Sequence, residues 1–117
     1  MLTCCDLKPG VDLAAFEGHL ARFTEYMTAE GLCLGCGPLG HRQASSGLDT
    51  DEERQHSLFF LMDFRDRAQA DAALAHIDAL GLRNVPTHLE VFRRVENPIF
   101  ICWADAPDAR SGAGGAR

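Results

Sequence analysis

The sequence lacks a surplus of basic residues: its 117 residues include 11 Lys and Arg against 17 Asp and Glu, which gives a net charge of −6. Nucleic acids and anionic membrane surfaces are bound through basic patches, so neither is expected as a partner. The first ten residues, MLTCCDLKPG, hold neither a basic segment nor a long apolar run. We therefore expect no signal peptide or membrane span there, and a cytoplasmic protein.

The signatures of several chemistries are also missing. The chain has no Ser-His-Asp order of a hydrolase, no P-loop and no dinucleotide-binding fingerprint. Its acidic segment, residues 45–55, lacks the ordered oxygen ligands and central Gly of an EF-hand. The five cysteines are an odd number in a chain without an export signal, which favours reduced thiols over disulfides.

Cys33 and Cys36 form a C-x-x-C motif, which serves in thioredoxin-like redox sites or as half of a zinc site. A redox pair belongs at a helix N-terminus, where the pKa of the attacking thiol falls, whereas this pair lies in a predicted strand. A zinc site needs two more ligands, which Cys4, Cys5 or His41 would supply only in a favourable register. We expect small buried side chains here, with no structural metal and no cofactor.

What the sequence does contain is one strongly apolar run, LFFLMDF at Leu58–Phe64. Seven residues with three Phe are too short and too aromatic for a helix, so the run predicts a strand. With a period of two, its even-numbered residues form a wholly apolar face, while Phe59 and Leu61 make the other face apolar in the middle only. The strand is therefore expected at the centre of a sheet that is covered on both faces.

The first half of the chain predicts a strand, a helix and an edge strand. Leu2–Leu7 is a short apolar strand that ends at a turn. Asp12 caps a helix that Gly31 stops and whose apolar residues recur every three or four positions. The segment 32–44 contains interior Gly residues and a Pro, which predicts an edge strand bent near Gly37-Pro38, followed by a polar loop.

After the central strand, Asp66 with Gln69 resembles a capping box and predicts a second helix through Leu80. A short third helix follows, with Asn84 or Thr87 as its cap and an end before Asn97-Pro98. Its predicted apolar face comprises Val85, Leu89, Phe92 and Val95.

The last strand is predicted at Ile99–Trp103. Residues 1–105 are expected to form a single α+β domain, and residues 106–117 a disordered tail after it. Right-handed crossovers place the first and third strands in the centre, in the four-stranded antiparallel order 4-1-3-2 of the ferredoxin-like split βαβ sandwich, with helices on one face. The other face, with Phe59 and Leu61, would expose a large apolar patch. We therefore expect a homodimer in which two sheets pack into a closed barrel.

At this point the chain resembles the dimeric α+β barrel superfamily, and within it a small uncharacterised bacterial family. The matching features are the segment Asp6–Gly10, the pair His41-Arg42, His88 and Val95 in the last helix, and a closing aromatic strand before a Pro. That strand and Pro are Phe100, Trp103 and Pro107. The resemblance implies the fold and dimerisation. No haem-ligand pattern and no Asn-Trp-His set of haem-degrading members is present.

Four polar residues are candidates for a site between the helices and the sheet: His41, Arg42, Asp63 and His88. His88 would act as general base with Asp63 as a second catalytic group, while Arg42 and His41 would bind a carboxylate or enolate. In the alternative, Asp63 pairs with Arg65 or Arg42, and the His residues are simply hydrogen-bonded. The predicted apolar walls of the site are Phe23, Met27, Leu89 and Phe92.

Two functions fit these features. In the first, the homodimer binds a small, partly apolar anionic metabolite in a cavity of each protomer, as a cofactor-independent oxygenase or isomerase of the kind that the superfamily contains. In the second, it is a non-catalytic dimer that binds a metabolite or a protein partner. A cavity of several hundred cubic ångströms with converging polar groups would favour the first, and a filled interior the second.

Overall fold

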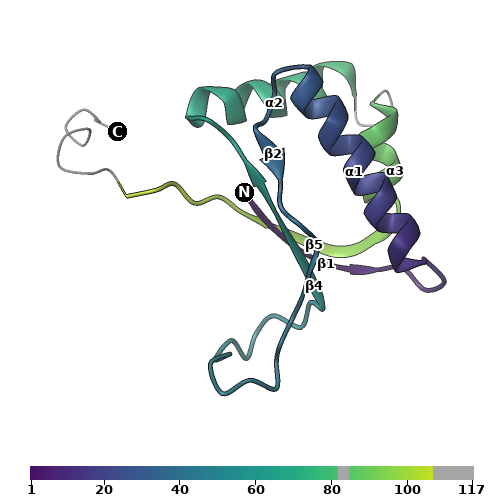
Figure 1. Ribbon diagram of the computed structural model, residues 1–117, viewed down its shortest axis with the longest axis vertical. Coiled ribbons are helices and arrows are strands. Elements are labelled where there is room, and N and C mark those ends of the chain that lie inside the picture. The colour runs from purple at the N-terminus through teal and green to yellow at the C-terminus, as the bar shows by residue number, and fades with distance from the viewer. Residues whose placement is uncertain (82–84, 107–117) are drawn as a thin grey trace.

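The protein is described by a computed structural model that covers residues 1–81 and 85–106. Its described part is of the α+β class, with five strands and three helices (Figure 1). In chain order the elements are β1 (Leu2–Leu7), α1 (Leu13–Ala29), β2 (Gly35–Cys36), β3 (Gly40–His41), β4 (Leu58–Asp63), α2 (Arg67–Leu80), α3 (Pro86–Phe92) and β5 (Val95–Ile101).

The strands form one antiparallel sheet in which the hydrogen-bonded path runs β2-β4-β1-β5, and β3 also pairs with β4. The predicted bend near Gly37-Pro38 is confirmed, because β2 ends at Cys36 and β3 starts at Gly40. Gly40 pairs with Phe59, and a Cβ at this position would clash with the Phe59 ring, so the missing side chain of Gly40 leaves room for that ring.

The two longer helices begin and end as the sequence predicts. The Asp12 carboxylate accepts a hydrogen bond from the Ala15 amide at 2.9 Å, and Asp66 caps α2 through the Gln69 amide at 2.8 Å. α1 ends next to Gly31, whose φ of 70° is a conformation that glycine adopts without steric cost. One face of α1 is buried, namely Phe16, Leu20, Phe23 and Met27.

The core lies between this helical face and one face of the sheet. Leu58, Phe60 and Met62 of β4 are all buried, each contributing roughly 1.5–3 kcal/mol. The alternate residues Phe59 and Leu61 are 38% and 44% exposed, because no element of the described chain covers their side of the sheet. The expectation of cover on both faces is therefore wrong for the single chain.

The boundary between α3 and β5 also differs from the prediction. α3 starts with Pro86 in its first turn, without a side-chain cap, and ends at Phe92, so Thr87 is not its cap and Val95 already belongs to β5. The strand then continues through Asn97-Pro98. Asn97 has a φ of 53°, and the pairing with β1 shifts register at this point, so a bulge accommodates the proline.

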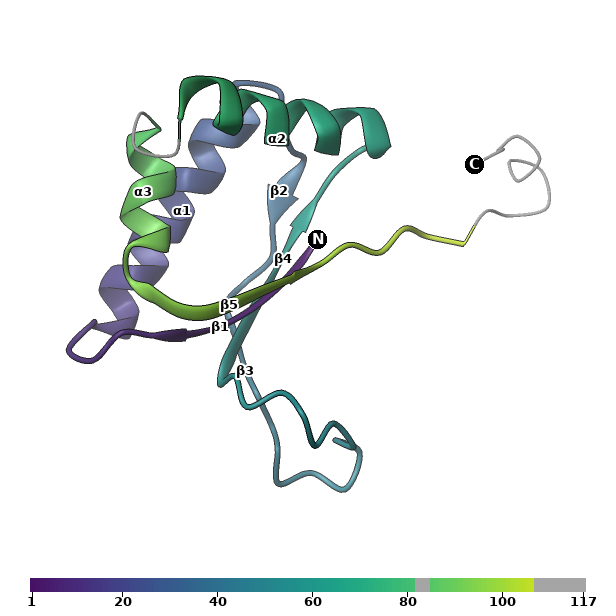
Figure 2. The same ribbon diagram turned by 180° about the vertical axis from the view of Figure 1, so that it is seen from behind.

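Two predictions lie outside the described residues: the alternative cap Asn84 and the tail from residue 107 onwards. Within the described ranges, no helix is both long and apolar enough to cross a membrane. The loop between β3 and β4 and the residues after β5 extend from the body on the side away from α1 and α3 (Figure 2).

Candidate functional site

The structure separates the polar residues predicted to form the site. His41 ends β3 and pairs with Leu58 at the start of β4, whereas Asp63 ends β4 and pairs with Gly35. Five residues of extended strand, roughly 17 Å, lie between these two positions. His41 and Asp63 are both exposed, so the sheet does not bring them to a common cavity.

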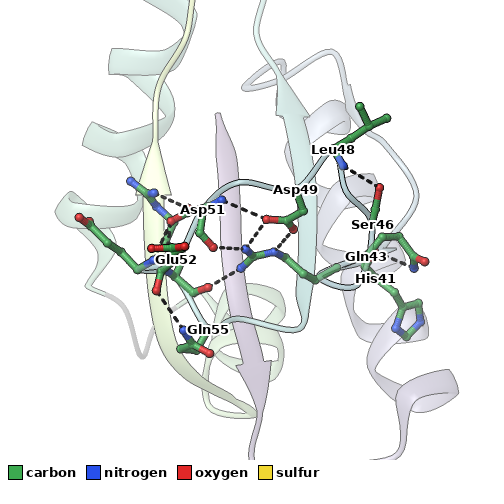
Figure 3. A network of polar contacts seen from close by, with 11 residues as sticks. His41, Gln43, Ser46, Leu48, Asp49, Asp51, Glu52 and Gln55 are labelled. Atoms are coloured by element: carbon green, nitrogen blue, oxygen red, sulfur yellow. Dashed lines mark hydrogen bonds and ion pairs between the residues drawn. The ribbon is translucent and has the colours of Figure 1, made fainter.

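Arg42 is the centre of a hydrogen-bond network within the loop that follows β3 (Figure 3). Its guanidinium binds the Asp49 carboxylate at 2.5 and 2.7 Å, the Asp51 carbonyl oxygen at 2.7 Å, and the carbonyl oxygen of Arg54. The hydrogen bond between the two side chains raises the pKa of Arg42 and lowers that of Asp49. The guanidinium is thus occupied by its own loop, and its predicted role with an anionic ligand has no support in this arrangement.

The same loop is ordered by a second ion pair. The Asp51 carboxylate accepts hydrogen bonds from the backbone amides of Glu53 and Arg54 and pairs with the Arg54 guanidinium at 2.5 Å. These hydrogen bonds lower the pKa of Asp51 to about 2, and the hydrogen bond from the Arg54 side chain has the largest effect. Asp49 and Asp51 of the acidic segment therefore serve to fix the loop.

His88 is the predicted polar residue that the structure does place beside the predicted aromatic walls, between α1 and α3. Its imidazole packs edge-on against Phe23, with centroids 5.4 Å apart, and lies 4.6 Å from the Phe92 ring. Phe92 in turn contacts Phe100 of β5 at 5.7 Å. We call these four residues, Phe23, His88, Phe92 and Phe100, the aromatic cluster.

Burial lowers the pKa of His88 below its ordinary value, so the imidazole is neutral at pH 7. Its ring nitrogens make no hydrogen bond to the described residues, which leaves them available for another donor or acceptor. Phe23 and Phe92 thus lie beside His88 as predicted, while Met27 is 2% exposed and belongs to the core. The sequence analysis did not include Phe100 in the site, although strand alternation would have placed it on the helical side of the sheet.

A group of charged and polar side chains on α1, on α3 and in the turn after α3 was also missed. Arg22 and the Nδ1 atom of His19 share a hydrogen bond at 2.8 Å, and Arg94 binds the Glu90 carboxylate at 2.9 Å. His19 and Glu90 approach to 3.8 Å across the two helices. The i, i+4 spacing of Glu90 and Arg94 was a visible signal, but the pairing between helices depends on how they pack.

Two hollows of the described residues open at the surface. One, of about 270 Å³, is lined by the loop after β3 and by His56 and Ser57. The other, of about 330 Å³, lies between α1 and the segment Cys36–Leu39. Neither includes His88 or Asp63. The space between the helices and the sheet is filled by the core, with Phe16 and Phe60 almost fully buried.

The cysteines show no reactive arrangement. All five are free thiols, and burial is the main cause that raises the pKa of both Cys33 and Cys36. Over the described ranges, no three His, Cys, Asp or Glu side chains gather in a way that would hold a metal ion. The absence of a structural metal stays a prediction that chelation would test.

Comparison with known proteins gives one structural neighbour. No family model matches the sequence, and no curated protein matches it. The fold is similar to the crystal structure of At3g17210 from Arabidopsis thaliana, refined as an ensemble, with a TM-score of 0.62. The match covers 90% of this chain and 92% of the other at 13% sequence identity. At that identity the likeness concerns the fold alone.

Proposed function

We propose that the protein is a homodimer with a ferredoxin-like sheet, and that two such sheets pack face to face as an α+β barrel. In this interpretation β2 and β3 are the two halves of one edge strand that is interrupted at residues 37–39. Counted in this way, the path through the sheet is 4-1-3-2. The pairing of β4 with both β2 and β3 supports it.

The observation that carries the dimer is an apolar sheet face without a partner. The strand register places six uncharged residues together on it: Leu2, Cys4, Phe59, Leu61, Ile99 and Ile101. We call this set the open face. Exposed apolar patches of this kind mark interaction sites in soluble proteins. Asp63 follows Phe59 and Leu61 at the end of the same face of β4, so the face is apolar in its middle. Because an isologous contact pairs a patch with itself, an apolar middle of this kind suits a second copy of the same chain.

Light scattering or sedimentation at micromolar concentration tests this proposal, with a dimer as the expected result. Phe59→Asp should give a folded monomer, because an unpaired charge at a closed sheet-to-sheet contact costs several kcal/mol. Leu61→Asp provides a second variant at the same face. Leu74→Asp is the matched control, since Leu74 is 63% exposed on α2, away from the open face. A wild-type monomer, or equal dissociation by the control, would overturn the proposal.

We further propose that the dimer binds a small, largely apolar molecule at the aromatic cluster. His88 supports this, because a neutral imidazole that makes no hydrogen bond to the described residues is held between aromatic rings. The same group could exchange a proton with a ligand, as an oxygenase or isomerase of this kind would require. The filled interior favours the alternative of a non-catalytic binding protein, and the occupied Arg42 no longer argues for an anionic ligand.

A thermal-shift screen of small aromatic and enolisable compounds tests the binding site. Any compound that raises the melting temperature should lose most of its effect in His88→Ala, because the variant removes the one unpaired polar group of the cluster. His41→Ala is the matched control, since His41 is exposed at the far end of the sheet. Equal binding by both variants would place the site elsewhere.

A further inference from the structure

The chain that follows Pro98 carries exposed large apolar side chains. Ile99 is 38% exposed, Phe100 48% and Trp103 76%. We call residues 99–106 the C-terminal arm. Within β5 alternate side chains point to the same side, so Ile99 and Ile101 lie on the open face, while Phe100 points to the helices and contacts Phe92. The same alternation, continued past the end of β5, would carry Trp103 to the side of the open face.

The register of β5 shows why Trp103 is uncovered. Ile101 pairs with Leu2, the first residue of β1, so Trp103 lies two residues past the end of that ladder. There the arm leaves the body of the molecule, on the side away from α1 and α3 (Figure 2). The apolar side of the arm is therefore continuous with the open face but extends beyond the sheet of its own chain.

We infer that Trp103 of each protomer packs against the open face of the second copy, an inference that rests on the proposed dimer. Four strands about 4.8 Å apart and six residues long at about 3.4 Å each give a sheet face of roughly 400 Å². The arm adds apolar surface directly next to this face, and so enlarges the area that a second copy can cover.

The geometry of packed sheets places a partner beneath the arm. Two sheets in face-to-face contact cross at about 30° or about 90°. A strand that continues past the end of its own ladder, with an apolar side chain on the open side, then faces the partner chain. Two-fold symmetry makes this contact twice, and Trp is the side chain most often found as a buried anchor at such contacts.

The chain offers a direct probe, because Trp103 is its one tryptophan. Above the dimer dissociation constant, Trp103 emission should lie at shorter wavelength and be protected from acrylamide. Dilution to monomer should shift the emission to longer wavelength and restore quenching. The Phe59→Asp monomer should give the exposed spectrum at every concentration.

Substitution measures the contribution of the arm. Trp103→Ala should weaken dimerisation about tenfold or more, as expected for loss of an aromatic anchor, whereas Leu74→Ala on α2 should leave it unchanged. A dimer whose Trp103 stays fully quenchable, or whose affinity is unaffected by Trp103→Ala, overturns the inference and leaves the dimer standing. A monomer at all concentrations overturns both.

Discussion

Gln69 connects two helices through hydrogen bonds that can be removed one at a time. The side chain is 4% exposed, its Oε1 atom accepts a hydrogen bond from the Arg65 amide at 2.6 Å, and its Nε2 atom donates one to the Gly31 carbonyl at 3.0 Å. Gly31 follows α1 and Arg65 precedes α2. The amide side chain therefore fixes the end of one helix to the start of the other.

Gln69→Met keeps the volume of the side chain and removes both hydrogen bonds. We expect a loss of about 2 kcal/mol in the free energy of unfolding, from two hydrogen bonds of about 1 kcal/mol each. For a chain of this size that corresponds to a fall in melting temperature of about 8 °C. Gln69→Glu keeps the acceptor but removes the donor and buries a charge, so it should cost at least as much.

The measurement is urea denaturation at one fixed protein concentration, since dimerisation would itself change the apparent stability. Gln55→Met is the matched control, because Gln55 is exposed, and should change stability by less than about 0.5 kcal/mol. If Gln69→Met is no less stable than this control, the two hydrogen bonds do not fix the helices.

Three further predictions concern the loop, the aromatic cluster and the thiols. Arg42→Met should speed tryptic cleavage at Arg54 with little change in global unfolding, because the guanidinium holds the loop rather than the core; equal cleavage rates would contradict this. Burial lowers the pKa of His88, so the unfolded chain binds the proton more tightly than the folded chain does. The free energy of unfolding should therefore decrease as pH falls below 6.5. In urea titrations, His88→Phe should make this pH dependence less steep. Burial, together with Asp6 and Cys4 nearby, raises the pKa of Cys5 to about 11. A thiol reagent at pH 8 should therefore label the exposed Cys102 before Cys5, and peptide mapping would show the order.

Local patterns were sufficient to predict most of the elements. The caps Asp12 and Asp66 and the stop at Gly31 depend on neighbours in sequence, and all three lie where they were expected. The end of α3 was missed because Asn97-Pro98 looks like a helix terminator, whereas it occupies a bulge. That bulge exists only because β1 pairs with β5 in a shifted register, which the sequence of one strand does not reveal.

The predicted site was missed in part for a similar reason. His41 and Asp63 each lie at a strand end, but antiparallel pairing puts them at opposite ends of β4. Arg42 had several acidic residues within reach, and the fold of its loop selected Asp49. By contrast, the prediction that His88 lies beside Phe23 and Phe92 needed only helix periodicity and the packing of two helices.

The two proposed contacts meet in one strand. Ile99 belongs to the open face, while its neighbour Phe100 contacts Phe92 in the aromatic cluster. A partner that holds β5 in place therefore also fixes one wall of the ligand site. Ligand binding and dimerisation should therefore be coupled, and the coupling must be equal in both directions. A compound that binds at the cluster should bind the Phe59→Asp monomer more weakly than the dimer, and at saturation it should lower the dimer dissociation constant by the square of that factor, because each dimer has two such sites. If a cluster ligand binds monomer and dimer equally, β5 does not transmit the contact, and the two sites are independent.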